Sequence, residues 1–544
     1  MIRNISNFNI KLNSVDKKNV SLPNFKGEQD IHETDYVTVY GDSPIRTNPT
    51  QLSLFHMHDF HGQNIRMEKA YNAIKQFDSG HLTNQNDIFD KNMPIDKLKL
   101  CSGDMFLGEN LDECAVVNEF LNISGVLANT IGNHECDTFI DLFNDKVSNR
   151  NYKFLGANIH PDKNSNMNNV LSKSFIADVH GNKYGVIGLS PIDIGTHLKR
   201  PDEAKPLNVQ NMEGTIKDLQ NDINNMKKQG VNKIIVLSHL GLPYEKYLAK
   251  NINDIDIILG GHTHDLLTEV KEGENLFYSP KGEPVLIMQV GRDGEYIGIP
   301  NIKFNESGQI TGIQYNVLKT DDFSRSVVAK NAFEKILGKP EVVGKIKYVE
   351  ESSKDIYANE NSNCDFIVDC MKSELDTDIA IMNSANIRGK FVKGDIDTRV
   401  LRLISPFANN VIVINASEKE LVDSIKKRTK STITSSNHRP GLLQVSGLKY
   451  TFDKTSGELL SLSFIEDDGD EKEIDIDNPR EDKLYTVATD DFCGASESGG
   501  LNLKHRVDKA LVKFNYDKDV IIANYLKKHT EPVVIVSDGR IQAV

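Results

Sequence analysis

Short apolar runs of strand length, each ending in a polar or glycine-rich turn, dominate the first half of the chain from Gln51 onward. Two stretches between them, 67–77 and 215–230, carry apolar residues three or four positions apart, which predicts helices. Strands that alternate with helices indicate an α/β domain of layered sheets. The expected strands lie in 52–55, 98–104, 124–135, 152–159, 183–190, 233–241 and 255–264.

The chain has 544 residues, too many for a single core, so two large domains are expected. We predict a polar N-terminal arm over 1–48, a first domain over 49–318, a helical linker over 319–346 and a smaller α/β domain over 347–544. The last domain has its own expected helix, 364–375, and expected strands at 378–384, 410–416 and 447–453. The acidic stretch 466–477 lacks the ligand spacing of a calcium loop and is interpreted as a solvated hairpin turn.

The composition limits the kinds of molecule that this chain is expected to bind. The net charge of −14 argues against a nucleic-acid polymer, whose phosphates need a basic face, but it does not exclude a small phosphorylated substrate. We see neither an apolar core of signal-peptide length nor a run approaching the ~20 apolar residues of a membrane span. The six cysteines form no CxxC pair. These features predict reduced cysteines, a cytoplasmic location and no membrane partner.

Potential metal ligands follow nearly every expected strand of the first domain. In an open α/β sheet, ligands gather at the carboxyl ends of strands, so we expect these side chains to converge. They offer oxygen and nitrogen atoms and no thiolate, which suits Mn²⁺, Zn²⁺ or iron and argues against a closed structural zinc site. The candidates are Asp59, His61, Asp104, Asn133, His239, His262 and His264.

Seven candidates exceed what one tetrahedral ion takes, so the sequence predicts two divalent ions. Such a pair, about 3.5–4 Å apart, needs one bridging carboxylate and further ligands on each side. Asp104, the lone carboxylate after Gly103, is the natural bridge. The chemistry that uses such a pair is in-line displacement at phosphorus.

At this point the motifs resemble a known family. D-x-H-G (59–62), G-D (103–104), G-N-H-E (132–135), His239 and G-H-T-H (261–264) are similar to the calcineurin-like metallophosphoesterases. The segments 380–389, 405–421, 442–453 and 485–492 resemble the C-terminal domain of the 5′-nucleotidases, a group that includes UDP-sugar hydrolases and 2′,3′-cyclic-nucleotide phosphodiesterases. The resemblance implies a metallophosphoesterase sandwich domain followed by a smaller α/β 5′-nucleotidase-type domain.

The resemblance also implies roles for residues. Asp59, His61, Asp104 and His264 would hold one ion, and Asp104, Asn133, His239 and His262 the other. His134 would stabilise the transition state or protonate the leaving oxygen, and Asp137 would orient it. Asn383 and Arg388 match positions that contact substrate from the second domain, and the linker would act as a hinge.

The departures from the family lie on the substrate side. Leu442 or Leu443 and Leu501 stand where the family has two aromatic rings around a nucleobase, and Asn359 stands about where it has an arginine. Tyr357, Phe407 and Phe492 are candidate replacement rings, with core residues as the alternative interpretation.

The leading hypothesis is therefore a two-metal hydrolase that releases phosphate from nucleotides. The alternatives are the same chemistry on a sugar phosphate, a 2′,3′-cyclic nucleotide or a UDP-sugar, and a non-catalytic binding protein on this fold.

Two further histidines lie just before the first motif. We expect His58 to support the metal site from outside the ligand set, and His56 to be structural.

Overall fold

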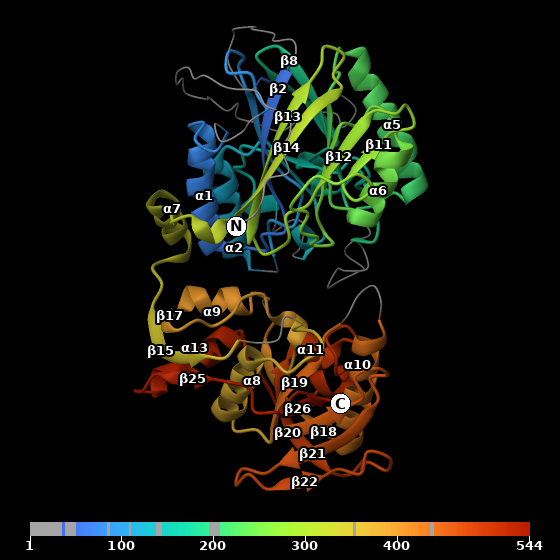
Figure 1. The fold of residues 1–544 in the computed structure, drawn as a ribbon. Helices are drawn as coiled ribbons and strands as arrows, with labels where there is room; N and C mark the ends of the chain where they lie inside the picture. The colour runs from blue at the N-terminus through green and yellow to red at the C-terminus, as the bar shows by residue number, and fades with distance from the viewer. Residues whose placement is uncertain are drawn as a thin grey trace. The chain divides into compact units, whose positions relative to one another are not determined.

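The computed structural model describes residues 35–38, 50–83, 88–107, 110–137, 144–194, 207–351, 355–407, 409–435 and 440–544. Contacts between residues divide the chain into two compact units, Met1–Gly338 and Lys339–Val544, which are treated separately below. The division falls within the segment 319–346 that was predicted as a linker. Both units mix helices with sheets (Figure 1), which confirms the predicted α/β class.

Two sheets form the centre of the first unit. The first sheet has the order β1-β7-β8-β9-β10-β12-β11, and the second has the order β14-β13-β2-β3-β4-β5-β6. The strands of the first sheet are β1 (Asp35–Thr38), β7 (Ser174–Val179), β8 (Asn182–Leu189), β9 (Ile234–Ser238), β10 (Ile257–Leu259), β12 (Pro284–Met288) and β11 (Leu276–Tyr278). Those of the second are β14 (Ile310–Lys319), β13 (Tyr296–Phe304), β2 (Thr50–Met57), β3 (Asp96–Cys101), β4 (Ala128–Thr130), β5 (Lys153–Leu155) and β6 (Leu171–Ser172).

Side-chain alternation along β2 shows how the layers are built. Leu52 and Leu54 belong to a buried core that also takes in Tyr184 and Leu237 of the other sheet, so they lie between the two sheets. Phe55 and Met57 belong to the core beneath the helices of the outer layer. Because both faces are covered, the strand is apolar on both sides, as is typical of parallel strands inside an α/β layer.

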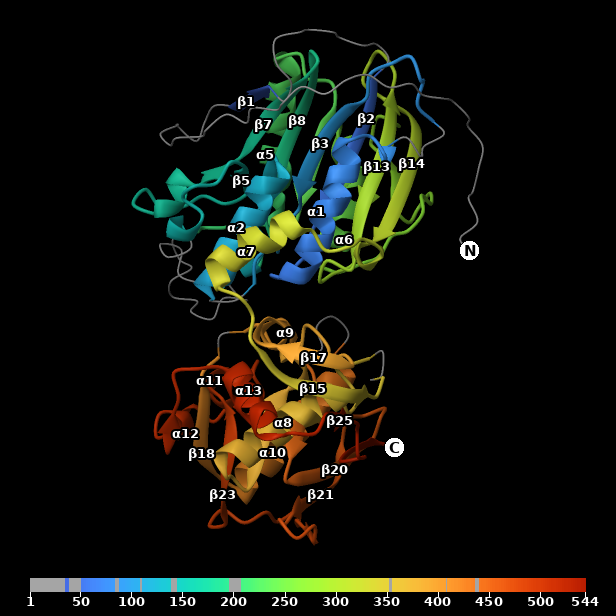
Figure 2. The ribbon, with the colours of Figure 1, turned by 90° about the vertical axis from the view of Figure 1, so that its left-hand side faces the viewer.

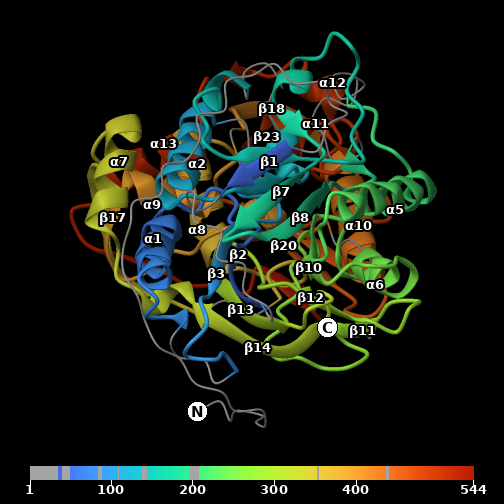
Figure 3. The same cartoon turned by 90° about the horizontal axis from the view of Figure 1, so that it is seen from above.

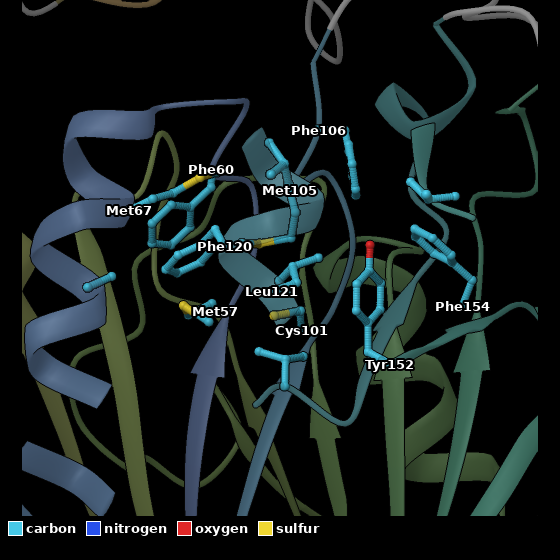
Figure 4. Close-up of a cluster of buried hydrophobic side chains, with 14 of the residues drawn as sticks. Met57, Phe60, Met67, Cys101, Met105, Phe106, Phe120, Leu121, Tyr152 and Phe154 are labelled. Carbon is cyan, nitrogen blue, oxygen red and sulfur yellow. The ribbon is translucent and has the colours of Figure 1, made fainter. Parts of the chain in front are cut away.

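Helices cover both outer faces of the paired sheets (Figures 2 and 3). On one side lie α1 (Asn64–Asp78), α2 (Leu111–Ser124) and α7 (Val327–Leu337), and on the other lie α5 (Met212–Lys228) and α6 (Leu242–Asn251). Figure 4 shows the core beneath α1 and α2, where Phe60, Met67 and Phe120 pack together above Met57. The helix α5 buries Leu219, Ile223 and Met226, the spacing of three or four that predicted it.

Two features of the first unit differ from the sequence-based prediction. Residues 35–38 of the predicted polar arm form β1, which pairs in parallel with β7. The sequence Asp-Tyr-Val-Thr contains three β-formers but does not alternate and stands among polar segments, so its pairing with β7 is what makes it a strand. The rest of the arm lies outside the described residues. The helix α7, expected in the linker, packs against α1 and α2 of the first unit, and the hinge role stays a prediction.

The second unit is built on sheets of its own, with the orders β19-β16-β23-β18-β24, β22-β21-β20-β26 and β17-β15-β25. The first sheet contains β19 (Leu443–Ser446), β16 (Ile379–Asn383), β23 (Leu484–Asp490), β18 (Val411–Ser417) and β24 (Val512–Lys513). The others contain β22 (Glu471–Glu473), β21 (Leu459–Ile465), β20 (Leu448–Phe452), β26 (Ile541–Ala543), β17 (Gly394–Asp397), β15 (Val342–Val349) and β25 (Val533–Ile535).

Helices complete this unit, with one core around Ile381 and Val445 and another around Ile367 and Met382. The acidic stretch forms the turn between β21 and β22, as predicted, since Ile465 pairs with Glu471. No helix among the described residues has both the length and the apolar character needed to cross a membrane. The helices are α8 (Ser362–Leu375), α9 (Thr398–Ile404), α10 (Glu418–Thr434), α11 (Asp491–Ala495), α12 (Lys504–Val507) and α13 (Lys518–Lys528).

Candidate metal centre and active site

The loops that follow β2 and β3 run side by side. The backbone N–H groups of Asp59, His61 and Gly62 donate to the carbonyls of Gly103, Asp104 and Met105, each at 3.0 Å. Because β2 and β3 are parallel neighbours, their carboxyl ends lie at the same edge of the sheet. Backbone hydrogen bonds alone therefore hold two of the predicted ligand motifs side by side.

Five of the predicted ligands have a left-handed backbone. Such a conformation is uncommon for residues other than glycine, and it clusters at functional sites because the surrounding structure must hold it there. Here it turns the side chains sharply away from the strand direction into a common space. The φ angles are 49° for Asp59, 48° for His61, 50° for Asp104, 80° for His262 and 60° for His264.

One group of ligands gathers around Asp59. The Nε2 atoms of His264 and His61 lie 3.2 and 3.5 Å from Asp59 Oδ1. The ligand atoms of these three residues all lie within 4.8 Å of one another. His61 Nε2 also lies 3.7 Å from Asp104 Oδ2, which links this group to the second one.

The second group gathers around Asp104. His239 Nε2 lies 3.0 Å from Asp104 Oδ2, and His262 completes a group of three whose ligand atoms lie within 4.8 Å. His262 Nδ1 lies 3.0 Å from Asn133 Oδ1. The structure thus brings together all seven predicted ligands, with Asp104 contacting ligands of both groups.

Three buried ligand atoms show whether metal ions fit this site. Asp59 Oδ1, His61 Nε2 and His239 Nε2 are buried and have no hydrogen-bond partner among the described residues. A buried polar atom left unpaired costs about 1–3 kcal/mol, so three of them at one point need a partner. Divalent cations supply it, because they accept carboxylate oxygen and imidazole nitrogen together. The residues therefore fit a dinuclear divalent metal centre.

The electrostatics agree with this assignment. Burial alone would lower the pKa of His239, but the carboxylates of Asp104 and Asp59 raise it to about 10. Burial, and then the proximity of His239, lower the pKa of His262 to about 4, so this ring is neutral as a ligand must be. The site therefore attracts positive charge. Its histidines cannot all provide that charge by protonation, because the His262 ring stays neutral.

Residues outside the ligand set fix the orientation of the ligands. His58 Nε2 accepts the backbone N–H of Val290 at 2.7 Å, so its Nδ1–H donates to Asp59 Oδ2 at 2.5 Å, which is the supporting position expected for His58. Asp293 Oδ1 lies 2.9 Å from His61 Nδ1. These contacts direct Asp59 Oδ1 and His61 Nε2 toward the metal site.

Glu135, whose role the sequence did not reveal, ties two ligand loops together. It accepts the N–H groups of Asp104 and Gly132 on one oxygen, and those of Met105 and the Asn129 side chain on the other, at 2.8 to 3.1 Å. Burial, followed by the charge of Asp104, raises the pKa of Glu135 to about 7, while His239 and the hydrogen bonds from Asn129 and Asp104 act to lower it. The signal was present in the G-N-H-E motif, but two of the four contacts that explain it, from Asp104 and Met105, come from another strand end.

His134 and Asp137 form a compact pair at the edge of the centre. They lie at either end of the short turn η2 (His134–Cys136), and His134 Nδ1 lies 2.5 Å from Asp137 Oδ2. The backbone N–H of His134 donates to Asp104 Oδ1 at 2.8 Å, and its ring lies 5.2 Å from that of His61. A proton exchanged with a substrate would therefore be handled by His134 Nε2, beside the metal ligands.

In the second unit, Asn383 and Arg388 flank the turn η5 (Ser384–Asn386). The Asn383 side chain accepts the N–H of Ala385 and donates to the carbonyl of Ser498. The Arg388 guanidinium lies 5.0 Å from the centre of the Phe407 ring. Their role as substrate contacts stays a prediction.

The departures from the family pattern are visible in the second unit. Leu442, Leu443 and Leu501, the candidates for the base-stacking positions, are buried in the core, with 0%, 1% and 2% exposure. The Asn359 side chain donates to the carbonyl of Asp355 and stabilises a local turn. Phe407 is half-buried against Arg388, so it differs from the core leucines.

Comparison with known families agrees with both halves of the chain. Residues 30–266 match the family model of the calcineurin-like phosphoesterases, and residues 342–504 match that of the 5′-nucleotidase C-terminal domain. Together the two matches cover most of the chain, and they confirm the resemblance that the motifs indicated. Calcineurin-like phosphoesterases use a dinuclear divalent metal centre, in line with the ligand groups above.

Individual proteins extend the similarity over both units. The chain is 25% identical over 480 residues to the trifunctional nucleotide phosphoesterase protein YfkN of Bacillus subtilis, covering 78% of this chain and 31% of that protein. It is 26% identical over 420 residues to the snake venom 5′-nucleotidase of Crotalus adamanteus, covering 68% of each. The chain thus spans about a third of the length of the first relative. The crystal structure of a 5′-nucleotidase precursor from Thermus thermophilus has the same fold, with a TM-score of 0.68 at 21% identity, covering 91% of this chain and 99% of that one.

Proposed function

We propose, from the premise that this chain belongs to the 5′-nucleotidase family of calcineurin-like metallophosphoesterases, that it hydrolyses phosphate esters of nucleotides at a centre of two divalent ions. One observation carries the proposal. Seven side chains with nitrogen or oxygen ligand atoms converge beside the His134–Asp137 pair, and three of these atoms are buried with no hydrogen-bond partner among the described residues. A binding protein without activity is less well supported, because all seven ligands are in place.

Two divalent ions, when bound, supply Lewis-acid stabilisation of the phosphoryl group and acidify a water nucleophile. The residues of the chain do the rest. His58 and Asp293 hold Asp59 and His61 in orientation, and Glu135 fixes the loop that carries Asp104. His134 Nε2 stabilises the phosphoryl oxygens or gives a proton to the leaving oxygen, while Asp137 fixes the tautomer of the ring and supports its charge.

For the ions we propose Mn²⁺, Zn²⁺ or iron. The ligand set combines imidazole nitrogen with carboxylate and amide oxygen and contains no thiolate. This mixture suits those ions better than Mg²⁺ or Ca²⁺, which prefer sites made of oxygen alone.

For the substrate we propose a nucleotide that is held with little discrimination between bases. The names of the relatives point to nucleotides. Stacking on aromatic rings contributes about 1–3 kcal/mol per base, and the two expected ring positions here are buried leucines. A sugar phosphate, a 2′,3′-cyclic nucleotide or a UDP-sugar is the alternative, because these esters need no ring sandwich.

The test is metal-dependent hydrolysis by the purified chain. With Mn²⁺ it should cleave a generic aryl phosphate, and a panel of AMP, UMP, 2′,3′-cAMP, UDP-glucose and sugar phosphates should show its preference. We expect kcat/KM to be highest for nucleotides and to change little between adenine and uracil. A preference for sugar phosphates would favour the alternative, and an absence of metal-dependent hydrolysis across the panel would overturn the proposal.

A further inference from the structure

His56 occupies a position where the fold calls for an apolar side chain. It lies on the same face of β2 as Leu52 and Leu54, between the two sheets, and it is completely buried. Its Nδ1 atom has no hydrogen-bond partner among the described residues. An unpaired buried nitrogen costs about 1–3 kcal/mol, which a leucine here would avoid. A packing role alone therefore does not explain why a histidine stands at this position.

The hydrogen bond made by His56 shows what the residue does. His56 Nε2 lies 2.7 Å from Ser102 Oγ, and Ser102 Oγ lies 2.8 Å from the carbonyl oxygen of Gly260. A carbonyl only accepts, so the Ser102 hydroxyl donates to Gly260, and His56 must donate its Nε2–H to Ser102. Burial, and then the proximity of His58, lower the pKa of His56, in keeping with a neutral ring that carries one N–H. The directions of both hydrogen bonds are therefore fixed.

Ser102 connects this chain of hydrogen bonds to the ligands of one ion. Its carbonyl accepts the Nδ1–H of His239 at 2.6 Å, which directs His239 Nε2 toward Asp104. Ser102 is two residues before Asp104, and Gly260 is two residues before His262. These hydrogen bonds, from His56 through Ser102 to Gly260, thus connect the ends of three strands. They involve the residue that orients His239 and the segments that lead to Asp104 and His262.

We propose that His56 is a positioning residue for the second ion, acting through the Ser102 hydroxyl on the ligand set Asp104, Asn133, His239 and His262. This inference rests on the proposed two-ion centre and replaces the structural role first expected for His56. The first ion has hydrogen-bonded supports of its own, His58 for Asp59 and Asp293 for His61, and the His56 ring only stacks on that of His58, at 5.1 Å between ring centres. Losing the His56 contact should therefore weaken one of the two ions selectively.

The experiment measures metal binding without substrate, so it is independent of activity. Mn²⁺ stoichiometry and affinity are determined by equilibrium dialysis and by the electron paramagnetic resonance signal of coupled Mn²⁺ pairs. The variant His56→Met keeps the volume and loses the donor, whereas His56→Gln restores an N–H close to the Nε2 position. Leu54→Met, on the same face of β2, is the matched control.

We expect His56→Met to bind one ion as the wild type does and the other about 10- to 100-fold more weakly, with loss of the coupled signal. His56→Gln should recover most of the second affinity, and Leu54→Met should change neither. Two unchanged affinities in His56→Met, or equal weakening of both ions, would overturn the positioning role. If His56→Met does not fold, as judged by circular dichroism, Ser102→Ala removes the middle link of the same chain of hydrogen bonds and is judged by the same outcomes. A wild-type protein that binds fewer than two ions would instead count against the two-ion proposal itself.

Discussion

At the residue scale, the His134–Asp137 pair is built locally and can be tested locally. Replacing His134 with Ala removes the group placed to handle the proton, so kcat on an aryl phosphate should fall by about 10²-fold or more. Asp137→Asn should lower kcat less, because the ring stays but its tautomer and charge lose support. Metal content should be unchanged in both variants, since neither residue belongs to the proposed ligand set.

The control for this prediction is His529→Ala, which replaces an exposed histidine in the second unit. Its kcat should equal that of the wild type. Full activity of His134→Ala at saturating metal would contradict the assigned role.

Asp293 offers a second residue-scale prediction. Its carboxylate lies 2.9 Å from His61 Nδ1 and fixes the ring that we propose binds the first ion. Asp293→Ala should weaken the first ion about 10- to 100-fold, as measured by competition with a chelator, and excess metal should restore activity. Glu295→Ala is the matched control, because Glu295 lies in the same loop and pairs with Arg66 instead. Equal metal affinity in the Asp293 and Glu295 variants would contradict the prediction.

The sequence could identify the ligands but not their supports. Asp59, Asp104 and His239 each follow an apolar run, so a local pattern marks them as residues at strand ends. Asp293 contacts a residue 232 positions away, and Ser102 contacts one 137 positions away. No local spacing encodes such pairs, because the sheet order that creates them is a property of the folded chain.

At the element scale, α8 carries a buried carboxyl group whose two oxygens lack a hydrogen-bond partner among the described residues, that of Asp365. Burial, with help from Glu360 and against Arg540, raises the pKa of Asp365 from 3.8 to about 9. Between these values the folded state keeps a proton that the unfolded state has lost, so the free energy of unfolding falls as the pH rises. Below pH 3.8 both states are protonated and the effect vanishes.

Asp365→Asn removes this titration, so it should raise Tm more at about pH 8 than at about pH 4.5. Thermal unfolding followed by circular dichroism at the two values measures the difference. Asp369→Asn is the control in the same helix, because Asp369 forms an ion pair with Arg540 and should not gain stability on losing its charge. An Asp365→Asn variant whose gain is the same at both pH values would refute the raised pKa.

Elements were predictable where the pattern was strong on its own. The helix α5 has a clear apolar spacing of three or four and ends just before Gly230, whose φ of 83° suits a residue that follows a helix. The strand β1 is short and stands among polar segments, and its hydrogen bonds are made to β7, far later in the chain. Its pairing partner, rather than its local sequence, makes it a strand.

At the scale of the whole molecule, the proposed metal centre draws its candidate ligands from the first unit. All seven ligands lie before Gly338, so metal removal should destabilise the first unit and leave the second unchanged. A ligand at about 100 times its Kd stabilises the folded state by about 2.7 kcal/mol, enough to shift an unfolding transition. Calorimetry of the full chain with and without chelator should show one transition moving to lower temperature. Equal shifts of all transitions would show that stability is not divided between the units in this way.

The substrate is the property of the whole molecule that sequence and fold determine least. The motifs sufficed to predict phosphoester chemistry, because each ligand and the His134–Asp137 pair belong to a short local motif. Leu442 and Leu501, which stand where the family has base-stacking rings, are buried in the core and so do not indicate which base or ester is bound. A shared fold hosts many activities, so hydrolysis of the substrate panel decides this point.

The left-handed backbone of the five ligands limits how far this protein can be engineered for heat resistance. The usual remedy for such a backbone is glycine, but glycine has no side chain with which to bind an ion. Libraries selected for heat resistance should therefore leave Asp59, His61, Asp104, His262 and His264 untouched and accumulate changes in distant elements such as α5 or α10. A heat-resistant variant that carries glycine at one of these positions should have exchanged metal binding for stability.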